Sequence, residues 1–132
     1  MRKVGLLGLL ISVVFVSCSE RKEYNVRHCS KIWDGNFYNL FKGEVDTEIS
    51  RHGDLQMERY KDGSTCNLKV EWLDSCRYRL TYLSGNENMK DKDLRPVIVQ
   101  ITGVKENSYT VEGWVEGSSF GTYTSEVFKR KQ

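Results

Sequence analysis

Proline and histidine are scarce in this sequence of 132 residues, which contains one Pro and two His. The glycines are spread along the chain, and together with the single Pro they argue against a disordered polypeptide. No C-x-x-C or H-x-x-x-H spacing occurs, and no glycine-rich phosphate-binding loop is present. We therefore expect a folded domain with no metal site and no bound cofactor.

A surplus of charge of one sign is also lacking. Lys and Arg together number 20, and Asp and Glu together number 18. Arg2 and Lys3 belong to a leader segment, and without them the two charges balance. A nucleic-acid-binding protein normally carries a basic surplus on one face. We therefore expect no nucleic-acid partner and interpret the basic residues 129–131 as a solvated terminus.

One apolar run stands out near the start of the chain. Residues 4–16 carry no charge but are too few to span a bilayer comfortably. They follow Arg2 and Lys3 and end at Ser17 and Cys18, which is the three-part pattern of a secretory signal. We predict that residues 1–17 are a signal peptide.

The end of this signal indicates lipidation. The tetrad at residues 15–18 resembles a lipobox, the recognition site of the lipoprotein signal peptidase, with Phe15 standing where that site prefers Leu. The resemblance implies a diacylglycerol on the Cys18 sulfur, cleavage before Cys18 and a third acyl chain on the new amine. Two or three acyl chains hold a protein firmly on a membrane. The alternative is an ordinary secretory signal with a cysteine at the cut by chance.

The 115 residues that would remain after cleavage are enough for one domain. Residues 18–27 are mostly polar and charged, which predicts a lipidated flexible tether, and residues 28–132 would form the domain. The residue that follows the lipid-carrying cysteine is Ser19 and not an Asp, which would direct retention in the inner membrane. This resembles the rule for sorting lipoproteins to the outer membrane. We expect a monomer in the cell envelope, attached to the outer membrane through its lipid anchor.

Short segments of alternating apolar and polar residues recur beyond residue 28, and we find no convincing 3.6-residue stripe. This pattern predicts an all-β domain of about eight antiparallel strands in an up-and-down meander. A meander of that size usually curls into a barrel or half-barrel, which removes exposed sheet edges. A two-sheet sandwich is the alternative.

The first hairpin whose strand register can be predicted lies between residues 45 and 57. Apolar positions alternate on both strands, and they share one face only if Ile49 lies opposite Leu55. Leu55 and Met57 would then lie on the same face as Ile49. The connection would be the loop 51–53, in which Gly53 can take the left-handed conformation.

The next hairpin determines which cysteines can meet. Its apolar faces align if Trp72 lies opposite Cys76, which puts Cys66 roughly 20 Å from Cys76. A disulfide needs Cα atoms within about 7 Å, so Cys29 pairs with either Cys76 or Cys66 in an oxidising compartment. We favour Cys29–Cys76, because Cys76 starts a strand where an incoming N-terminal segment can dock. Cys66 would then remain a buried thiol.

Two further pairings are expected in the C-terminal half. Residues 105–107 form a short loop in which Asn107 would tolerate the left-handed position. In the final strand Tyr123 would lie opposite Gly113. An aromatic ring that covers a cross-strand glycine stabilises a sheet.

The aromatic residues suggest a binding function. An eight-stranded barrel either fills itself with side chains or encloses one small ligand, and with this chain length we favour a filled core. If a ligand is enclosed, aromatic side chains would line its site. The candidates are Phe37, Tyr78, Tyr82, Trp114 and Tyr123, with Trp33 and Tyr38 as further members of the set.

A match to G-x-S-x-G at residues 117–121 raises the alternative of a small envelope hydrolase that uses Ser119. In α/β hydrolases this motif joins a strand to a helix, and the catalytic His follows the Ser in the chain. Here a strand is predicted to follow, and both histidines precede Ser119. We therefore expect no catalytic residues and no enzyme.

Several segments resemble a known group of proteins. The run Val70–Leu80, the segments 49–51 and 56–58, and His28-Cys29 followed by residues 35–37 are similar to small uncharacterised β-rich lipoproteins of Gram-negative bacteria. The resemblance covers most of residues 28–83 and implies a lipocalin-like meander without a known active site. Some members of this group are named as DNA topoisomerases. A domain that is small and carries no net charge does not fit that activity.

These expectations favour a non-enzymatic binding module of the cell envelope. Its partner would be a protein, an envelope polymer or a small apolar ligand.

Overall fold

The computed structural model describes residues 27–86, 93–119 and 121–131. The predicted signal peptide, Cys18 and nearly all of the predicted tether lie outside these ranges. No helix within them has the length and apolar character needed to cross a membrane. The elements are η1 (Cys29–Ile32), a 3-10 helix, and the strands β1 (Gly35–Phe41), β2 (Glu44–His52), β3 (Leu55–Tyr60), β4 (Thr65–Asp74), β5 (Arg77–Gly85), β6 (Val97–Val104), β7 (Ser108–Val115) and β8 (Tyr123–Lys129).

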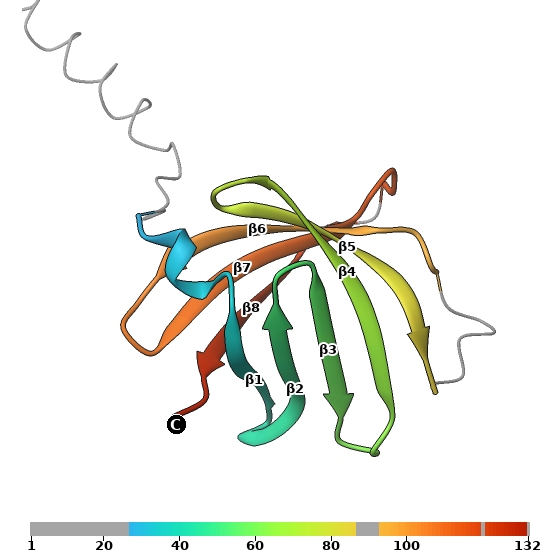
Figure 1. The fold of residues 1–132 in the computed structure, drawn as a ribbon, viewed down its shortest axis with the longest axis horizontal. Coiled ribbons are helices and arrows are strands. Elements are labelled where there is room, and N and C mark those ends of the chain that lie inside the picture. Colours follow the sequence, from blue (N-terminus) through green and yellow to red (C-terminus); the bar gives the residue numbers. More distant parts are fainter. Residues whose placement is uncertain (1–26, 87–92, 120, 132) are drawn as a thin grey trace, which may run out of the picture.

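The eight strands form a closed barrel in which each strand pairs with the next in the chain (Figure 1). All pairings are antiparallel, so the predicted all-β meander is confirmed, and it closes as a full barrel. The closing seam between β8 and β1 is short. It pairs Phe37 with Lys129 and Tyr38 with Phe128.

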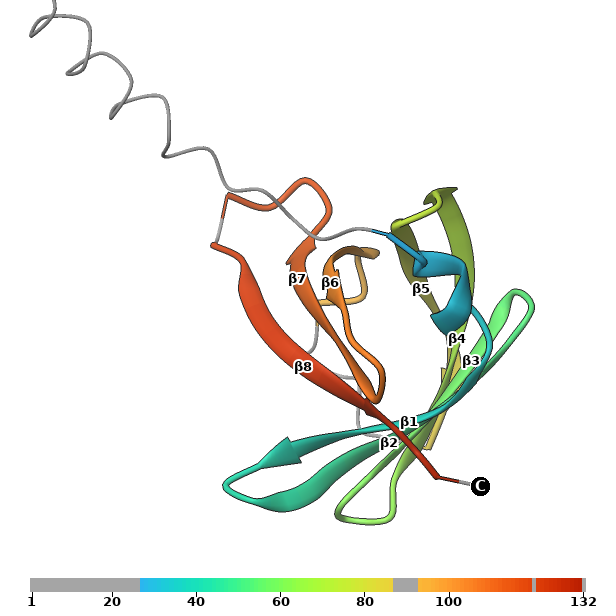
Figure 2. The same ribbon diagram turned by 90° about the vertical axis from the view of Figure 1, so that its left-hand side faces the viewer.

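The two ends of the barrel differ. At one end, which we call the plugged end, η1 lies beside the β2–β3 and β4–β5 turns (Figure 2). The indole N–H of Trp33 donates to the carbonyl oxygen of Ser75 (3.0 Å), and the backbone N–H of Gly53 donates to Asp34 (2.9 Å). The opposite end, the open end, carries the β1–β2, β3–β4, β5–β6 and β7–β8 connections.

A disulfide fixes η1 to the plugged end. It joins Cys29 in η1 to Cys76 in the β4–β5 turn, with a Cα–Cα distance of 5.3 Å. The favoured pairing is therefore confirmed, and the alternative Cys29–Cys66 is excluded. Cys66 is buried near the open end, where it pairs with Gly85 across β4 and β5.

The predicted register of the β2–β3 hairpin is wrong. The connection is only Gly53-Asp54, with Gly53 at φ 61°, so Ile49 pairs with Glu58 instead of Leu55. A shift by an odd number of residues moves a strand's side chains to the other face. Met57 is consequently 51% exposed, while Gln56 faces the barrel interior.

The β4–β5 hairpin is also shifted, but by an even number of residues. Trp72 pairs with Tyr78 instead of Cys76, with an irregularity between Trp72 and Asp74. The Asp74 carboxylate accepts a hydrogen bond from the backbone N–H of Cys76 (2.9 Å), which tightens the turn. Because the shift is even, the predicted apolar faces of both strands still coincide.

The 105–107 loop lies where it is predicted, between β6 and β7. Its geometry differs in one respect, because Asn107 does not have a positive φ. Among the described non-glycine residues, only His28 and Lys42 do. The backbone N–H of Lys105 donates to the carbonyl oxygen of Ser108 (2.8 Å), and this bond closes the turn without a left-handed residue.

The core of the barrel is built around a buried arginine. Arg51 is 0% exposed, on the inward face of β2. Its Nη1 donates to the carbonyl oxygen of Ile32 in η1 (2.7 Å), and its Nε donates to Oε1 of Gln56 (2.8 Å). Its Nη2 donates to the hydroxyl oxygens of Tyr78 (3.2 Å) and Tyr109 (3.0 Å). A buried charge is tolerated only with such partners.

Aromatic rings complete the surroundings of this guanidinium. Its central carbon lies 5.2 Å from the ring centroid of Phe37 and 4.9 Å from that of Tyr78. The negative faces of the rings stabilise the cation. Aliphatic side chains such as Val70, Val99 and Ile101 fill the space between the rings. The plugged half of the barrel is thus a packed core.

Candidate functional site

The open half of the barrel is not filled. A cavity of about 250 Å³ lies there, lined by inward-facing residues of β3, β4, β5, β6 and β8 and by the loop that precedes β6. Three cross-strand pairs contribute both members to its wall, so the sheet register itself shapes the cavity. These pairs are Glu58 with Cys66, Leu68 with Tyr82, and Leu80 with Val97.

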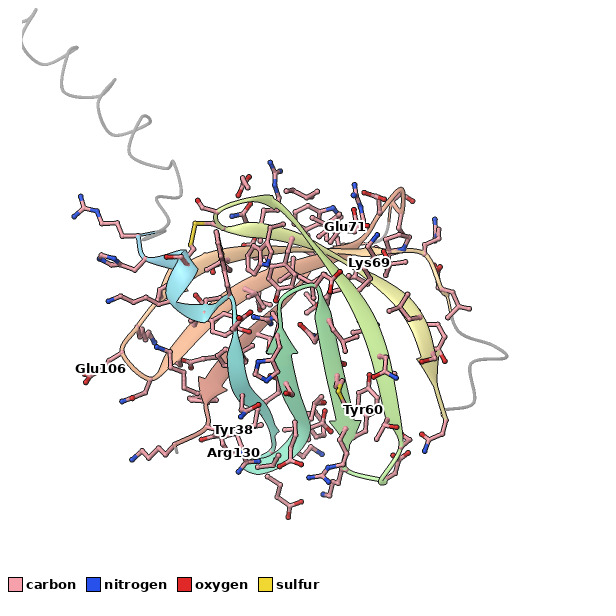
Figure 3. The ribbon with its side chains drawn as sticks, viewed as in Figure 1. Tyr38, Tyr60, Lys69, Glu71, Glu106 and Arg130 are labelled. Atoms are coloured by element: carbon pink, nitrogen blue, oxygen red, sulfur yellow. A yellow bond between two sulfur atoms is a disulfide. The ribbon has the colours of Figure 1, made fainter. Side chains whose placement is uncertain are left out.

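Glu58 is the carboxylate that β3 places inside the barrel. Its Oε2 accepts a hydrogen bond from the side-chain amide of Gln56 (2.6 Å), and its Oε1 accepts one from the hydroxyl of Tyr60 (2.8 Å). The Tyr60 hydroxyl also lies 3.2 Å from the sulfur of Cys66. Figure 3 shows Tyr60 near the end of β3 that is remote from η1. These bonds fix the orientation of Glu58 in the cavity wall.

A chain of hydrogen bonds connects this wall to the core. Arg51 can only donate, so the Gln56 side chain turns its carbonyl oxygen toward Arg51 and its amide toward Glu58. Glu58 must then accept this bond through its Oε2. The Glu58 carboxyl group therefore lies one side-chain amide away from the Arg51 guanidinium.

Tyrosine hydroxyls near Glu58 remain protonated. Burial and the nearby Glu58 carboxylate raise the pKa of Tyr60 far above its ordinary value. Burial and the same carboxylate also raise the pKa of Tyr123. Protonated phenols can donate hydrogen bonds, and within the described residues the hydroxyl of Tyr123 donates none to the protein. It is available to a ligand.

The position of Tyr123 depends on a glycine. Tyr123 pairs with Gly113 across β7 and β8, as the sequence predicts. A Cβ at Gly113 would overlap the Tyr123 ring, so only glycine leaves room for the ring against the sheet. In this position Tyr123 forms part of the cavity wall while remaining 51% exposed.

A Gly113→Ala substitution is expected to displace the Tyr123 ring and to lower the free energy of unfolding by about 1–3 kcal/mol, because the new methyl group overpacks the site. Urea denaturation measures the loss. Gly121→Ala is the control, since nothing lies within 4 Å of a Cβ at that position.

A double-mutant cycle identifies the cause of this loss. In a Tyr123→Ala background, Gly113→Ala should cost little, because the overlapping ring is gone. An equal cost in both backgrounds would contradict the proposed contact between Gly113 and Tyr123.

The structure brings together only part of the predicted aromatic set. Tyr82 and Tyr123 line the cavity. Phe37 and Tyr78 are buried in the core around Arg51. Trp114 pairs with Ile98 and directly follows Gly113, which faces the barrel interior. Successive side chains of a strand point to opposite faces, so the Trp114 side chain lies on the outer face of the sheet.

The two other aromatic candidates lie elsewhere. Trp33 lies just beyond η1 and contacts Trp72, with ring centroids 5.2 Å apart. Tyr38 stacks on Phe128 at the seam, with ring centroids 5.5 Å apart, and the guanidinium of Arg130 lies over its ring (Figure 3). Neither residue lines the cavity.

Ser119 lies in the β7–β8 connection, in an exposed position at the open end. The next element along the chain is strand β8, so the strand-to-helix turn of a nucleophile elbow is not formed among the described residues. His28 precedes η1 and His52 ends β2, and both positions are at the plugged end. The described residues also contain no cluster of three side chains that could hold a metal ion.

Sequence reasoning missed Glu58, Tyr60 and Cys66 as wall residues of one cavity. The signal that would have found them is the turn at residues 53–54. Two-residue hairpin loops with glycine in the first position are among the commonest, and that length places Gln56, Glu58 and Tyr60 inside the barrel.

Two other hollows are weaker candidates for a ligand site. One of about 480 Å³ lies over β1 to β4 and shares Glu58 and Cys66 with the cavity wall, but its other carboxylate, Glu48, is already bonded to Arg59 and Arg130. Another, of about 490 Å³, lies beside η1, where the indole N–H of Trp33 and one carboxylate oxygen of Asp34 are bonded to backbone groups. The cavity at the open end is therefore the best candidate site.

Comparisons of the chain with protein-family models, with curated proteins and with solved structures find no match.

Proposed function

We propose that this chain is a non-enzymatic binding module of the cell envelope that takes a small ligand into the open end of its barrel. The observation that supports this proposal is the cavity around Glu58. Ligand sites are typically concave and mostly apolar, with a few placed polar groups. Here aliphatic side chains and tyrosine rings surround one oriented carboxylate.

The proposal reconciles the two expectations for an eight-stranded barrel. The plugged half is filled by Arg51 and its aromatic neighbours, so it holds the barrel together. The open half keeps space for a molecule. A division of this kind lets a small domain be both stable and hollow.

Native mass spectrometry of the full chain, extracted from its own membrane, tests ligand uptake. We expect a bound small molecule in the wild-type protein. Leu80→Phe should displace it, because Leu80 lines the cavity and a larger side chain would fill it. Leu83→Phe on the same strand is the control, since Leu83 is exposed.

The outcome that contradicts the proposal is specific. If the wild-type protein carries no bound molecule and also takes up none of the added probes benzyl alcohol, benzylamine and benzoate, the open end is not a ligand site. Bound mass that survives Leu80→Phe unchanged would place the ligand elsewhere on the protein.

We propose further that three acyl chains on Cys18 attach this module to the outer membrane. The support is the charged start, the apolar run and the lipobox-like tetrad at residues 15–18, together with the resemblance to β-rich lipoproteins of Gram-negative bacteria. A Cys18→Ser protein is expected to leave the membrane fraction. A Cys18→Ser protein that stays with membranes, or a wild-type mass that includes residues 1–17 without lipid, would disprove the anchor.

A further inference from the structure

We infer that the ligand of the open-end cavity is a small molecule that joins a protonated amine to an apolar body. This inference rests on the proposed function and names the chemistry of the ligand. It follows from the sign of the charge in the cavity, from the rings around it and from the character of the remaining wall.

The first support is the carboxylate. Each oxygen of Glu58 accepts one hydrogen bond from the protein, from Gln56 and from Tyr60. A carboxylate oxygen has two lone pairs, so both oxygens keep acceptor capacity. An ammonium group supplies donors and the opposite charge, and such charge-assisted bonds are the stronger kind.

The second support is the set of tyrosine rings. Tyr60, Tyr82 and Tyr123 all contribute to the same cavity wall as Glu58. Aromatic faces attract cations within about 6 Å of the ring centroid. Carboxylate and rings therefore favour the same ligand charge.

Other charges near the cavity do not reverse this preference. Arg95 at the rim is bonded through its Nε and Nη2 to both oxygens of Asp93, and these bonds lower the Asp93 pKa to about 2. That pair is neutral as a unit. Arg51 is fully buried beyond Gln56 and does not line the cavity.

Anionic ligands and purely apolar ligands fit this cavity less well than an amine does. An anion would meet the Glu58 carboxylate, and among the described wall residues there is no unpaired cation to offset the repulsion. A purely apolar ligand would remove water from that carboxylate and return no hydrogen bond, which is costly. An amine with an apolar body contacts Glu58 at one end and Leu68, Leu80 and Val97 at the other.

Three probes of nearly equal shape test the inference. Benzylamine is cationic at pH 7, benzyl alcohol is neutral and benzoate is anionic, and each is small enough for a cavity of about 250 Å³. Their dissociation constants are measured by calorimetry on the full chain at low salt. We expect benzylamine to bind about tenfold more tightly than benzyl alcohol, and benzoate to bind most weakly.

Variants assign the preference to one side chain. Glu58→Gln should remove the advantage of the amine over the alcohol. Glu48→Gln, on the outer face, is the matched control and should keep the full preference. The wild-type comparison needs no variant, so the inference stays testable even if Glu58→Gln folds poorly.

Each result has a separate meaning. Equal binding of amine and alcohol, or tightest binding of benzoate, overturns the amine assignment while the ligand-binding function stands. A preference that survives in Glu58→Gln overturns the role of Glu58. No binding of any probe overturns the proposed function itself.

Discussion

An Arg51→Ala protein is expected to lose about 5 kcal/mol of its free energy of unfolding. The substitution leaves a large cavity at the centre of the plugged half. It also strands the carbonyl oxygen of Ile32, the side-chain oxygen of Gln56 and two tyrosine hydroxyls in an environment closed to water. The free energy of unfolding of a small domain is about 5–15 kcal/mol in total. The variant should therefore be close to unfolded at 25 °C.

Urea denaturation at pH 7, followed by tryptophan fluorescence, measures this loss. Arg59→Ala is the control, because Arg59 is also on the β2–β3 hairpin but pairs with Glu48 on the exposed face. Exposed ion pairs contribute about 0–1 kcal/mol. A loss below about 1 kcal/mol for Arg51→Ala would show that the guanidinium does not organise the core.

An Arg51→Lys variant separates charge from geometry. Lys keeps the positive charge but lacks the planar fork that reaches partners on opposite sides. We expect an intermediate loss of about 2–3 kcal/mol, since some hydrogen bonds would be left unmade.

Removing the Cys29–Cys76 disulfide is expected to cost about 4 kcal/mol of unfolding free energy. The bridge spans a sequence separation of 47 residues, and a link of that length restricts the unfolded chain strongly. Its loss also releases η1, whose Ile32 carbonyl accepts a bond from Arg51. The double variant Cys29→Ser/Cys76→Ser is compared with the wild type by urea denaturation.

Added reductant provides the matched control for this comparison. It should lower the stability of the wild-type protein by the same amount and leave the double variant unchanged. Cys66→Ala should retain the disulfide, as shown by the intact mass after alkylation. A double variant as stable as the wild type would mean that η1 is held by its other contacts alone.

Local apolar patterns predicted much of the fold. The eight strands follow from period-2 alternation, and the pairing of Tyr123 with Gly113 and of Cys29 with Cys76 is confirmed. Each of these depends on strand order and on apolar residues facing inward. Such features tolerate an even shift of register, as the β4–β5 hairpin demonstrates.

The polar interior could not be predicted in the same way. Reasoning from apolar faces turned Leu55 and Met57 inward, whereas the structure buries Arg51 and Gln56 and leaves Met57 exposed. A buried arginine is stabilised by partners from η1, β5 and β7, and no local segment shows those contacts in advance. The β2–β3 connection has two residues instead of the predicted three. This difference decides which side chains of β3 face inward, and therefore places Glu58 inside the barrel.

The short seam between β1 and β8 has a consequence for how the barrel assembles. Every other pairing joins neighbours along the chain, so little chain entropy is lost when those hairpins form. The seam instead joins Phe37 and Tyr38 to the last strand through two paired positions, with one further backbone bond from Arg130 to the carbonyl oxygen of Asn36 (2.9 Å). Contacts between distant residues form slowly, and a small interface opens most readily. We therefore expect closure of the seam to be the last folding step, and the β8 amides that face β1 to exchange with deuterium before those that face β7.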